Sequence, residues 1–215
     1  MKKKNQQALL ARKIAIFERA LENNPTSVPL LIGHMELCGE VWEEDKLLKR
    51  WKDVVFKHPN SPELWLAYIQ FCQSHFSSFT VNSMSSLYSK CIYTPRAIQE
   101  GTLKSHRPHP RTPYSLLSIF YLYCSLMQQV GHSERGVACF QALIEFNLCT
   151  PPEVSREGTS HKEQLEFFET FWDSGVPRFG EAGAPGWNNW MQSTRGRKPL
   201  GTLGLVETAM CVKAP

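Results

Sequence analysis

The sequence lacks the short motifs by which the common active sites are recognised. It contains no Gly-x-Ser-x-Gly turn for a serine nucleophile and no Gly-x-x-x-x-Gly-Lys-Ser/Thr loop for phosphate. Its seven cysteines form no Cys-x-x-Cys pair, and an odd number cannot all be joined in disulfides within one chain. We therefore expect reduced thiols, no enzymatic activity and no cofactor.

Long apolar runs and strong charge of one sign are also scarce. The most apolar stretch, residues 114–127, is shorter than the roughly 20 residues that span a bilayer, so we expect a buried helix there and no membrane partner. The net charge is only +4, which permits contact with nucleic acid without arguing for it. Hydrophobic residues make up 42% of the chain, enough to build a core.

What the sequence does contain is a repeat of 34 residues. Six residue pairs recur in order at this spacing: Phe17 with Trp51, Pro25 with Pro59, Ser27 with Ser61, Leu30 with Leu64, Leu37 with Phe71, and Cys38 with Cys72. Such a period is typical of stacked helical hairpins, in which each unit buries its apolar face against its neighbours. The sequence therefore predicts an all-α fold, an α–α superhelix of TPR-like hairpin repeats with an irregular C-terminal tail.

Apolar residues at spacings of three and four predict eight helices. Within the repeat, Pro25 and Pro59 end one helix, while Ser27 and Ser61 can cap the next. A short helix is expected near 187–191. The eight longer helices are expected at 6–23, 27–41, 44–58, 61–75, 81–93, 113–130, 133–148 and 161–174.

We expect three regions along the chain. The helical repeats cover 6–174 and are interrupted by a proline-rich, basic insertion loop at 95–112. An irregular aromatic and glycine-containing segment, 175–192, is expected to pack on the last hairpin, and 193–215 to form a disordered tail. Because the repeat begins with the second half of a unit and has no polar capping helix before it, we expect a fragment or isoform of a longer protein.

The repeat also predicts which side chains build the core. Aromatic residues recur at helical spacing, which favours packing between helices over stacking on nucleic-acid bases. The positions expected to set the shape of the solenoid are Phe17, Ala20, Trp51, Leu64, Trp65, Tyr68 and Phe71.

A metal site or an active site is a competing interpretation of four residues in these helices. His34, Cys38, Cys72 and His75 are of the types that bind zinc, and a histidine could also serve as a catalytic base. However, Cys38 and Cys72 are repeat equivalents, so both should point into a hairpin core. We therefore expect neither metal nor catalysis here.

Direct RNA binding is the competing interpretation of the insertion loop. Lys104, Arg107 and Arg111 lie there outside the helical patterns and could contact phosphates. Charge runs of this kind are more often solvated loops. Affinity that falls steeply with salt would distinguish the two.

Two stretches resemble the half-a-TPR (HAT) repeat of RNA-processing proteins. Residues 63–72, ELWLAYIQFC, resemble the first HAT helix, and residues 11–25, ARKIAIFERALENNP, resemble the second. As a whole, residues 8–192 resemble the "necessary for RNA interference" family, also called nuclear RNAi defective two. The runs WEEDKLLKRWKDVVFKHPNSPELWLAYIQFCQSHFSSF and FFETFWDSGVPRFGEAGAPGW add to that similarity, whereas residues 193–215 do not resemble the family.

The resemblance implies a function as well as a fold. It implies a HAT solenoid that binds protein partners in the nucleus, with links to the RNA-helicase and exosome machinery, and it brings no catalytic residue and no small-molecule substrate. The expected function is a non-enzymatic, protein-binding scaffold in nuclear RNA processing, RNA decay regulation or RNA-mediated gene silencing. The alternative is a direct RNA-binding module that uses the basic loop.

Overall fold

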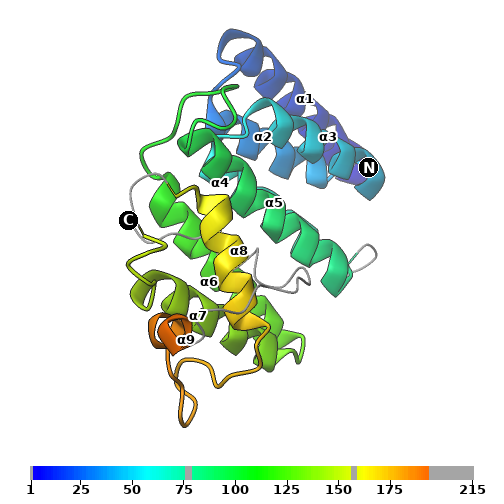
Figure 1. Ribbon diagram of the computed structural model, residues 1–215. Helices are drawn as coiled ribbons and strands as arrows, with labels where there is room; N and C mark the ends of the chain where they lie inside the picture. Colours follow the sequence, from blue (N-terminus) through cyan, green and yellow to red (C-terminus); the bar gives the residue numbers. More distant parts are fainter. Residues whose placement is uncertain (1, 76–78, 156–158, 194–215) are drawn as a thin grey trace. The chain divides into compact units, whose positions relative to one another are not determined.

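The computed structural model describes residues 2–75, 79–155 and 159–193, and these ranges contain helices and no strand (Figure 1). The all-α prediction is confirmed. The helices are α1 (Lys2–Asn23), α2 (Val28–Gly39), α3 (Glu44–Lys57), α4 (Pro62–Ser74), α5 (Val81–Gln99), α6 (Thr112–Gln129), α7 (Ser133–Leu148), α8 (His161–Trp172) and α9 (Trp187–Ser193). Of the predicted tail, Ser193 ends α9, and residues 194–215 lie outside the described residues.

The helix starts follow the local signals in the sequence. Ser27 and Ser61 occupy the N-cap positions of α2 and α4, although neither side chain makes a capping hydrogen bond, and each is followed by a proline in the first turn. A proline costs little there, because the first N–H groups of a helix have no partner within it. Helix α8 begins with a capping box, in which Ser160 and Glu163 each accept a hydrogen bond from the other's backbone N–H.

The fifth helix is longer than the sequence predicts, so the insertion loop is shorter than the expected 95–112. Helix α5 continues through Pro95 to Gln99. A proline inside a helix costs about 3 kcal/mol, because it lacks the backbone N–H and crowds the preceding turn. Burial of the side chains at 96–98 offsets this cost, so tertiary packing prevails over the local signal. The connection to α6 is confined to residues 100–111.

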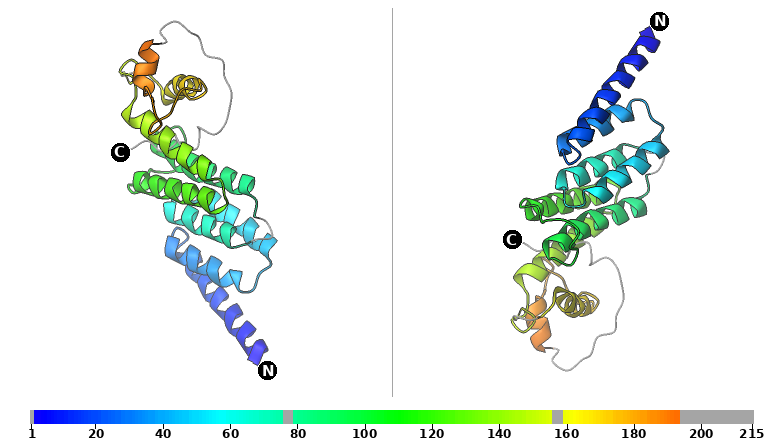
Figure 2. Two further views of the ribbon diagram at one scale, coloured as in Figure 1. Left: turned by 90° about the horizontal axis from the view of Figure 1, so that it is seen from below. Right: turned by 90° about the horizontal axis from the view of Figure 1, so that it is seen from above.

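The chain divides into two compact units, of which unit 1 comprises Met1–Leu87 and Ala97–Thr112. It holds a first hairpin, α1–α2, and a second hairpin, α3–α4. Helix α1 packs mainly on α2, whereas α2 also packs against both helices of the second hairpin. The views in Figure 2 show α2, α3 and α4 side by side, as a two-layered hairpin stack requires.

Unit 2 comprises Tyr88–Arg96 and the described residues from Pro113 onward. Its aromatic core joins α7, α8 and α9: Trp187 lies in a stacked arrangement with Phe146, with ring centroids 5.7 Å apart, and edge-on to Phe168 at 4.8 Å. The Trp187 backbone N–H also donates to the Glu145 carboxylate at 3.0 Å. The segment after α8 thus returns to α7 and α8 at this tryptophan.

None of the helices within the described ranges combines the length and the apolar character needed to cross a bilayer.

Candidate interaction surface

A groove opens in unit 1 between α1 and α3, with α2 beneath it. We call it the unit 1 groove, and its volume is about 540 Å³. Helices α1 and α3 and the residue after α3 form its walls, and α2 and the turn after α1 complete its lining. The residues that line it are Glu18, Leu21, Glu22, Pro25, Leu31, His34, Arg50, Val54, Lys57 and His58.

Two residues of α2 that line the groove are smaller than their equivalents in the second hairpin. Leu31 and His34 face the groove, and one repeat later the same positions are Trp65 and Tyr68. Both of these larger side chains are buried, and the Trp65 indole N–H donates to the Pro59 carbonyl at 2.9 Å. The same repeat positions thus carry large core side chains in the second hairpin and line a groove in the first.

His34 forms the polar part of the groove floor. It is only 3% exposed, and its Nε2 lies 3.5 Å from the Cys38 sulfur and 3.9 Å from a Glu18 carboxylate oxygen. Burial lowers the pKa of His34 below its usual value; the Glu18 charge opposes this shift and the Arg50 charge adds to it. The imidazole is therefore neutral at physiological pH.

The two walls carry opposite charge. Glu18 and Glu22 lie on α1, and Glu18 is 56% exposed at the side chain. Arg50 and Lys57 lie on α3, on the other side of the floor. An apolar floor between an acidic and a basic wall suits a protein segment better than a polyanion, which the acidic wall would repel.

The positions predicted to form the repeat core differ in burial between the two hairpins. In the first hairpin Phe17 and Ala20 are half-buried, and Phe17 lies against α2, where a Cβ added at Gly33 would meet its ring at 3.0 Å. In the second hairpin the buried positions are Trp51, Leu64, Trp65 and Tyr68, with Phe71 half-buried.

The basic loop is fastened to the turn between α3 and α4. His106 Nε2 lies 3.1 Å from the Lys57 carbonyl, and the Asn60 side-chain amide donates to the Arg107 carbonyl at 3.0 Å. Lys104, Arg107 and Arg111 are exposed. Burial lowers the pKa of His58, and the nearby His106 and Lys57 lower it further. Positive charge thus gathers at the end of α3.

The four candidate metal ligands are not brought together. His34 and Cys38 pair with each other on α2, whereas His75 lies close to the Phe71 carbonyl, with its Nδ1 at 2.8 Å. In the part of the chain that the structure describes, no three His, Cys, Asp or Glu side chains are grouped as a metal ion needs.

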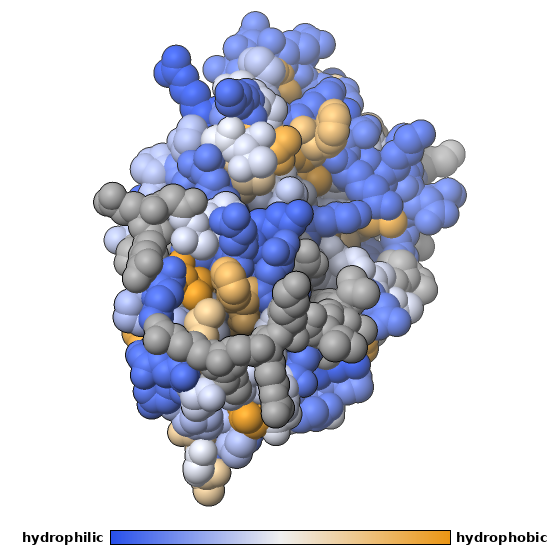
Figure 3. Space-filling view, in the orientation of Figure 1, coloured by the Kyte–Doolittle hydropathy of each residue, from blue (hydrophilic) through white to orange (hydrophobic). Residues whose placement is uncertain are grey.

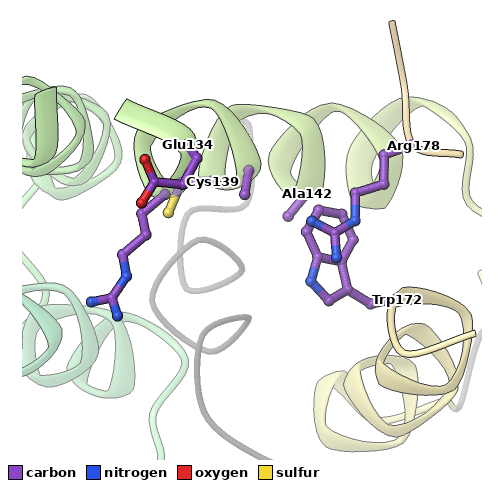
Figure 4. Close-up of a pocket in the computed structure, with 7 residues that line it drawn as sticks. Glu134, Cys139, Ala142, Trp172 and Arg178 are labelled. Atoms are coloured by element: carbon purple, nitrogen blue, oxygen red, sulfur yellow. The ribbon is translucent and has the colours of Figure 1, made fainter. Parts of the chain in front are cut away.

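A second, smaller pocket lies in unit 2 between α7 and the end of α8 (Figure 4). Its volume is about 240 Å³, and Cys139 and Ala142 of α7 form its apolar side. The Arg178 guanidinium lies over the Trp172 ring, 3.9 Å from the centroid, and closes one end. The sequence did not predict this pair, because Arg178 follows a chain reversal that has no helical period.

Figure 3 shows one face of the molecule coloured by hydropathy. Hydrophilic residues cover most of that face, and the hydrophobic ones appear in small, separate areas. Small apolar areas are ordinary on protein surfaces and carry little information. The unit 1 groove, which combines shape with charge, is therefore the stronger candidate.

The described helices, with the 34-residue register shared by the first two hairpins, define an all-α helical-repeat protein. The chain belongs to the family described as NRDE-2, necessary for RNA interference, whose model matches residues 1–203. The family resemblance seen in residues 8–192 is thereby confirmed.

Several curated proteins are similar to this chain. The nuclear exosome regulator NRDE2 of Mus musculus is 44% identical over 195 residues, covering 90% of this chain and 16% of the relative. The protein of the same name from Homo sapiens is 43% identical over 196 residues, covering 91% and 17%, and that from Dictyostelium discoideum is 26% identical over 197 residues, covering 86% and 15%. The chain thus spans about a sixth of the length of these relatives. No solved structure matches it.

Proposed function

We propose that this chain is a non-enzymatic scaffold that binds protein partners in nuclear RNA processing, RNA decay regulation or RNA-mediated gene silencing. Its relatives are named nuclear exosome regulators, and its family is described as necessary for RNA interference. The hairpins are HAT repeats on this proposal, and the chain works in the nucleus. The observation that carries the proposal is the unit 1 groove, whose apolar floor and charged walls suit a protein segment.

Crosslinking mass spectrometry tests this proposal. The full chain, added to nuclear extract, should crosslink to proteins of RNA processing or decay through lysines on α3, such as Lys57, which lines the groove, and Lys46. A matched sample from cytoplasmic extract is the control. Recovery of the same neighbours from both extracts, or of none connected with RNA, would contradict the proposal.

Direct RNA binding is a second candidate, because the basic loop is held in place by two hydrogen bonds to the second hairpin. A fixed loop loses less conformational freedom on binding than a free one. Lys104, Arg107 and Arg111 would then contact phosphates, and the loop would add RNA affinity to a scaffold.

Titration of a single-stranded RNA at low and moderate salt tests this second candidate. Replacing Lys104, Arg107 and Arg111 by glutamate should weaken binding at least about tenfold and reduce the slope of log K against log salt by about 2, since three phosphate contacts are lost. Glutamate at the exposed Lys13, Lys49 and Lys52 gives a control of equal charge. No binding at low salt, or equal loss in both variants, would exclude RNA recognition by this loop.

A further inference from the structure

We propose that the unit 1 groove binds an amphipathic helix of a partner protein, whose apolar stripe is flanked by basic residues on one side and acidic residues on the other. This inference rests on the proposed scaffold function and specifies the ligand that the scaffold holds. It is carried by the length, the chemistry and the charge of the groove.

The length of the groove matches the spacing of anchors on a helix. Its α3 wall extends from Arg50 to Lys57, which at 1.5 Å per residue is about 10 Å. Apolar anchors at positions i, i+3 or i+4, and i+7 of a helix span the same distance. About two turns of a partner helix can therefore lie in the groove.

The apolar part of the groove favours a helix over an extended peptide. Leu21 of α1, Leu31 of α2 and Val54 of α3 present only apolar atoms, and His34 is the one polar side chain on α2 that lines the groove. An extended peptide would bury backbone N–H and C=O groups against these side chains without hydrogen-bond partners, at a cost of about 1–3 kcal/mol for each group. A helix satisfies its own backbone and offers only side chains to the floor.

The walls determine which helix fits and in which direction it lies. Basic residues of the partner would face Glu18 and Glu22, and acidic residues would face Arg50 and Lys57. Turning a helix end for end exchanges its two flanks, so a helix with one basic and one acidic flank has one favourable direction. A helix with like charges on both flanks meets repulsion from one wall in either direction.

Selection from a phage-displayed library tests the proposal without knowledge of the natural partner. The library presents amphipathic helices of about 15 residues, long enough to hold helical structure, with every flanking position varied. The full chain, immobilised, should enrich helices that carry an apolar stripe with one basic and one acidic flank. A synthetic peptide made from the enriched sequence then gives the affinity in solution.

Reversing one wall should change the selection. With Glu18→Lys and Glu22→Lys both walls are basic, so the variant should bind the first peptide about tenfold more weakly and should enrich helices with two acidic flanks. Both glutamates are exposed, which keeps the fold intact. The matched control is Glu36→Lys with Glu40→Lys, two exposed residues outside the groove, which should select as the original chain does.

Three outcomes would overturn the proposal: no enrichment, enrichment of extended sequences without helical period, or the same selection by the wall variant and the original chain. Sedimentation of the chain alone gives a fourth such outcome. If the chain self-associates and the wall variant does not, the groove binds a second copy of the chain. If the selection fails while nuclear partners are still recovered by crosslinking, the groove proposal falls and the scaffold function stands.

Discussion

The two hairpins of unit 1 follow one repeat pattern but differ in what fills them. In the second hairpin the ring centroid of Trp51 lies 6.0 Å from the ring centroids of both Tyr68 and Phe71. In the first hairpin the corresponding residue is Phe17, which lies against Gly33 and is half-buried. The comparison shows that one register can give a closed core or an open groove, depending on side-chain volume and on the walls that neighbouring helices supply.

Because of this difference, we expect the two hairpins to have different roles. The second hairpin buries large aromatic side chains, each worth several kcal/mol, and so carries much of the stability of unit 1. The first hairpin buries less and presents charged walls beside an apolar floor. We therefore expect substitutions in the second hairpin to act on folding and those in the first to act on binding.

The largest effect should come from truncating the same repeat position in each hairpin. Trp65→Ala should reduce the free energy of unfolding by about 3–5 kcal/mol, because it empties a core position and removes the hydrogen bond to Pro59. Leu31→Ala should cost only about 2 kcal/mol, because Leu31 borders the open groove. Urea denaturation measures both, and equal losses would show that the hairpins do not differ as described.

A smaller effect should follow from giving the first hairpin the side chains of the second. Leu31→Trp with His34→Tyr should fill part of the groove and weaken the selected helix at least about tenfold, or about 1.4 kcal/mol, while the larger side chains reduce the free energy of unfolding by about 1–3 kcal/mol. Fluorescence anisotropy of the labelled peptide reports binding. The control is Leu66→Met in α4, a half-buried position outside the groove. Undiminished binding by the filled variant would place the helix elsewhere.

The smallest effect should be a dependence of stability on pH, to which His34 of the first hairpin contributes. Because burial holds the pKa of His34 below the 6.5 of an unfolded chain, the unfolded state takes up a proton more readily. The contribution of His34 to the free energy of unfolding is therefore fully present above about pH 6.5, and it is lost as the pH falls from there through the lowered pKa of the folded chain. In His34→Tyr this decline should be shallower, since a tyrosine hydroxyl titrates only near about pH 10.

Thermal unfolding across this pH range measures the decline. His58 of the second hairpin also has a lowered pKa and contributes in the same direction, so His58→Gln should also make the decline shallower and measures that contribution separately. An unchanged slope in His34→Tyr would show that this imidazole does not resist protonation in the folded chain.

Most of the fold could be predicted because local signals and packing agree. Ser27, Ser61 and the helical spacing of apolar residues indicate the same helices that the structure contains. They disagree at Pro95, where the sequence indicates a loop and burial of the following residues keeps the helix intact. Burial in the folded chain decided that position, and a single sequence does not show which residues become buried.

The groove could not be predicted in the same way. It arises from a difference in volume between Leu31 and Trp65 and between His34 and Tyr68, together with the walls that α1 and α3 supply. The repeat alignment treats these pairs as equivalent, because both members are compatible with a helix. The groove could have been predicted by comparing side-chain size at equivalent repeat positions.

The end of α3 connects the groove to the basic loop. Lys57 and His58 belong to the groove wall, and the Lys57 carbonyl also holds His106 of the basic loop. If an occupant of the groove changes the affinity of the loop for a ligand, thermodynamic reciprocity requires that ligand to change the affinity of the groove by the same factor. A helix in the groove and a polyanion on the loop would then each change how tightly the other binds.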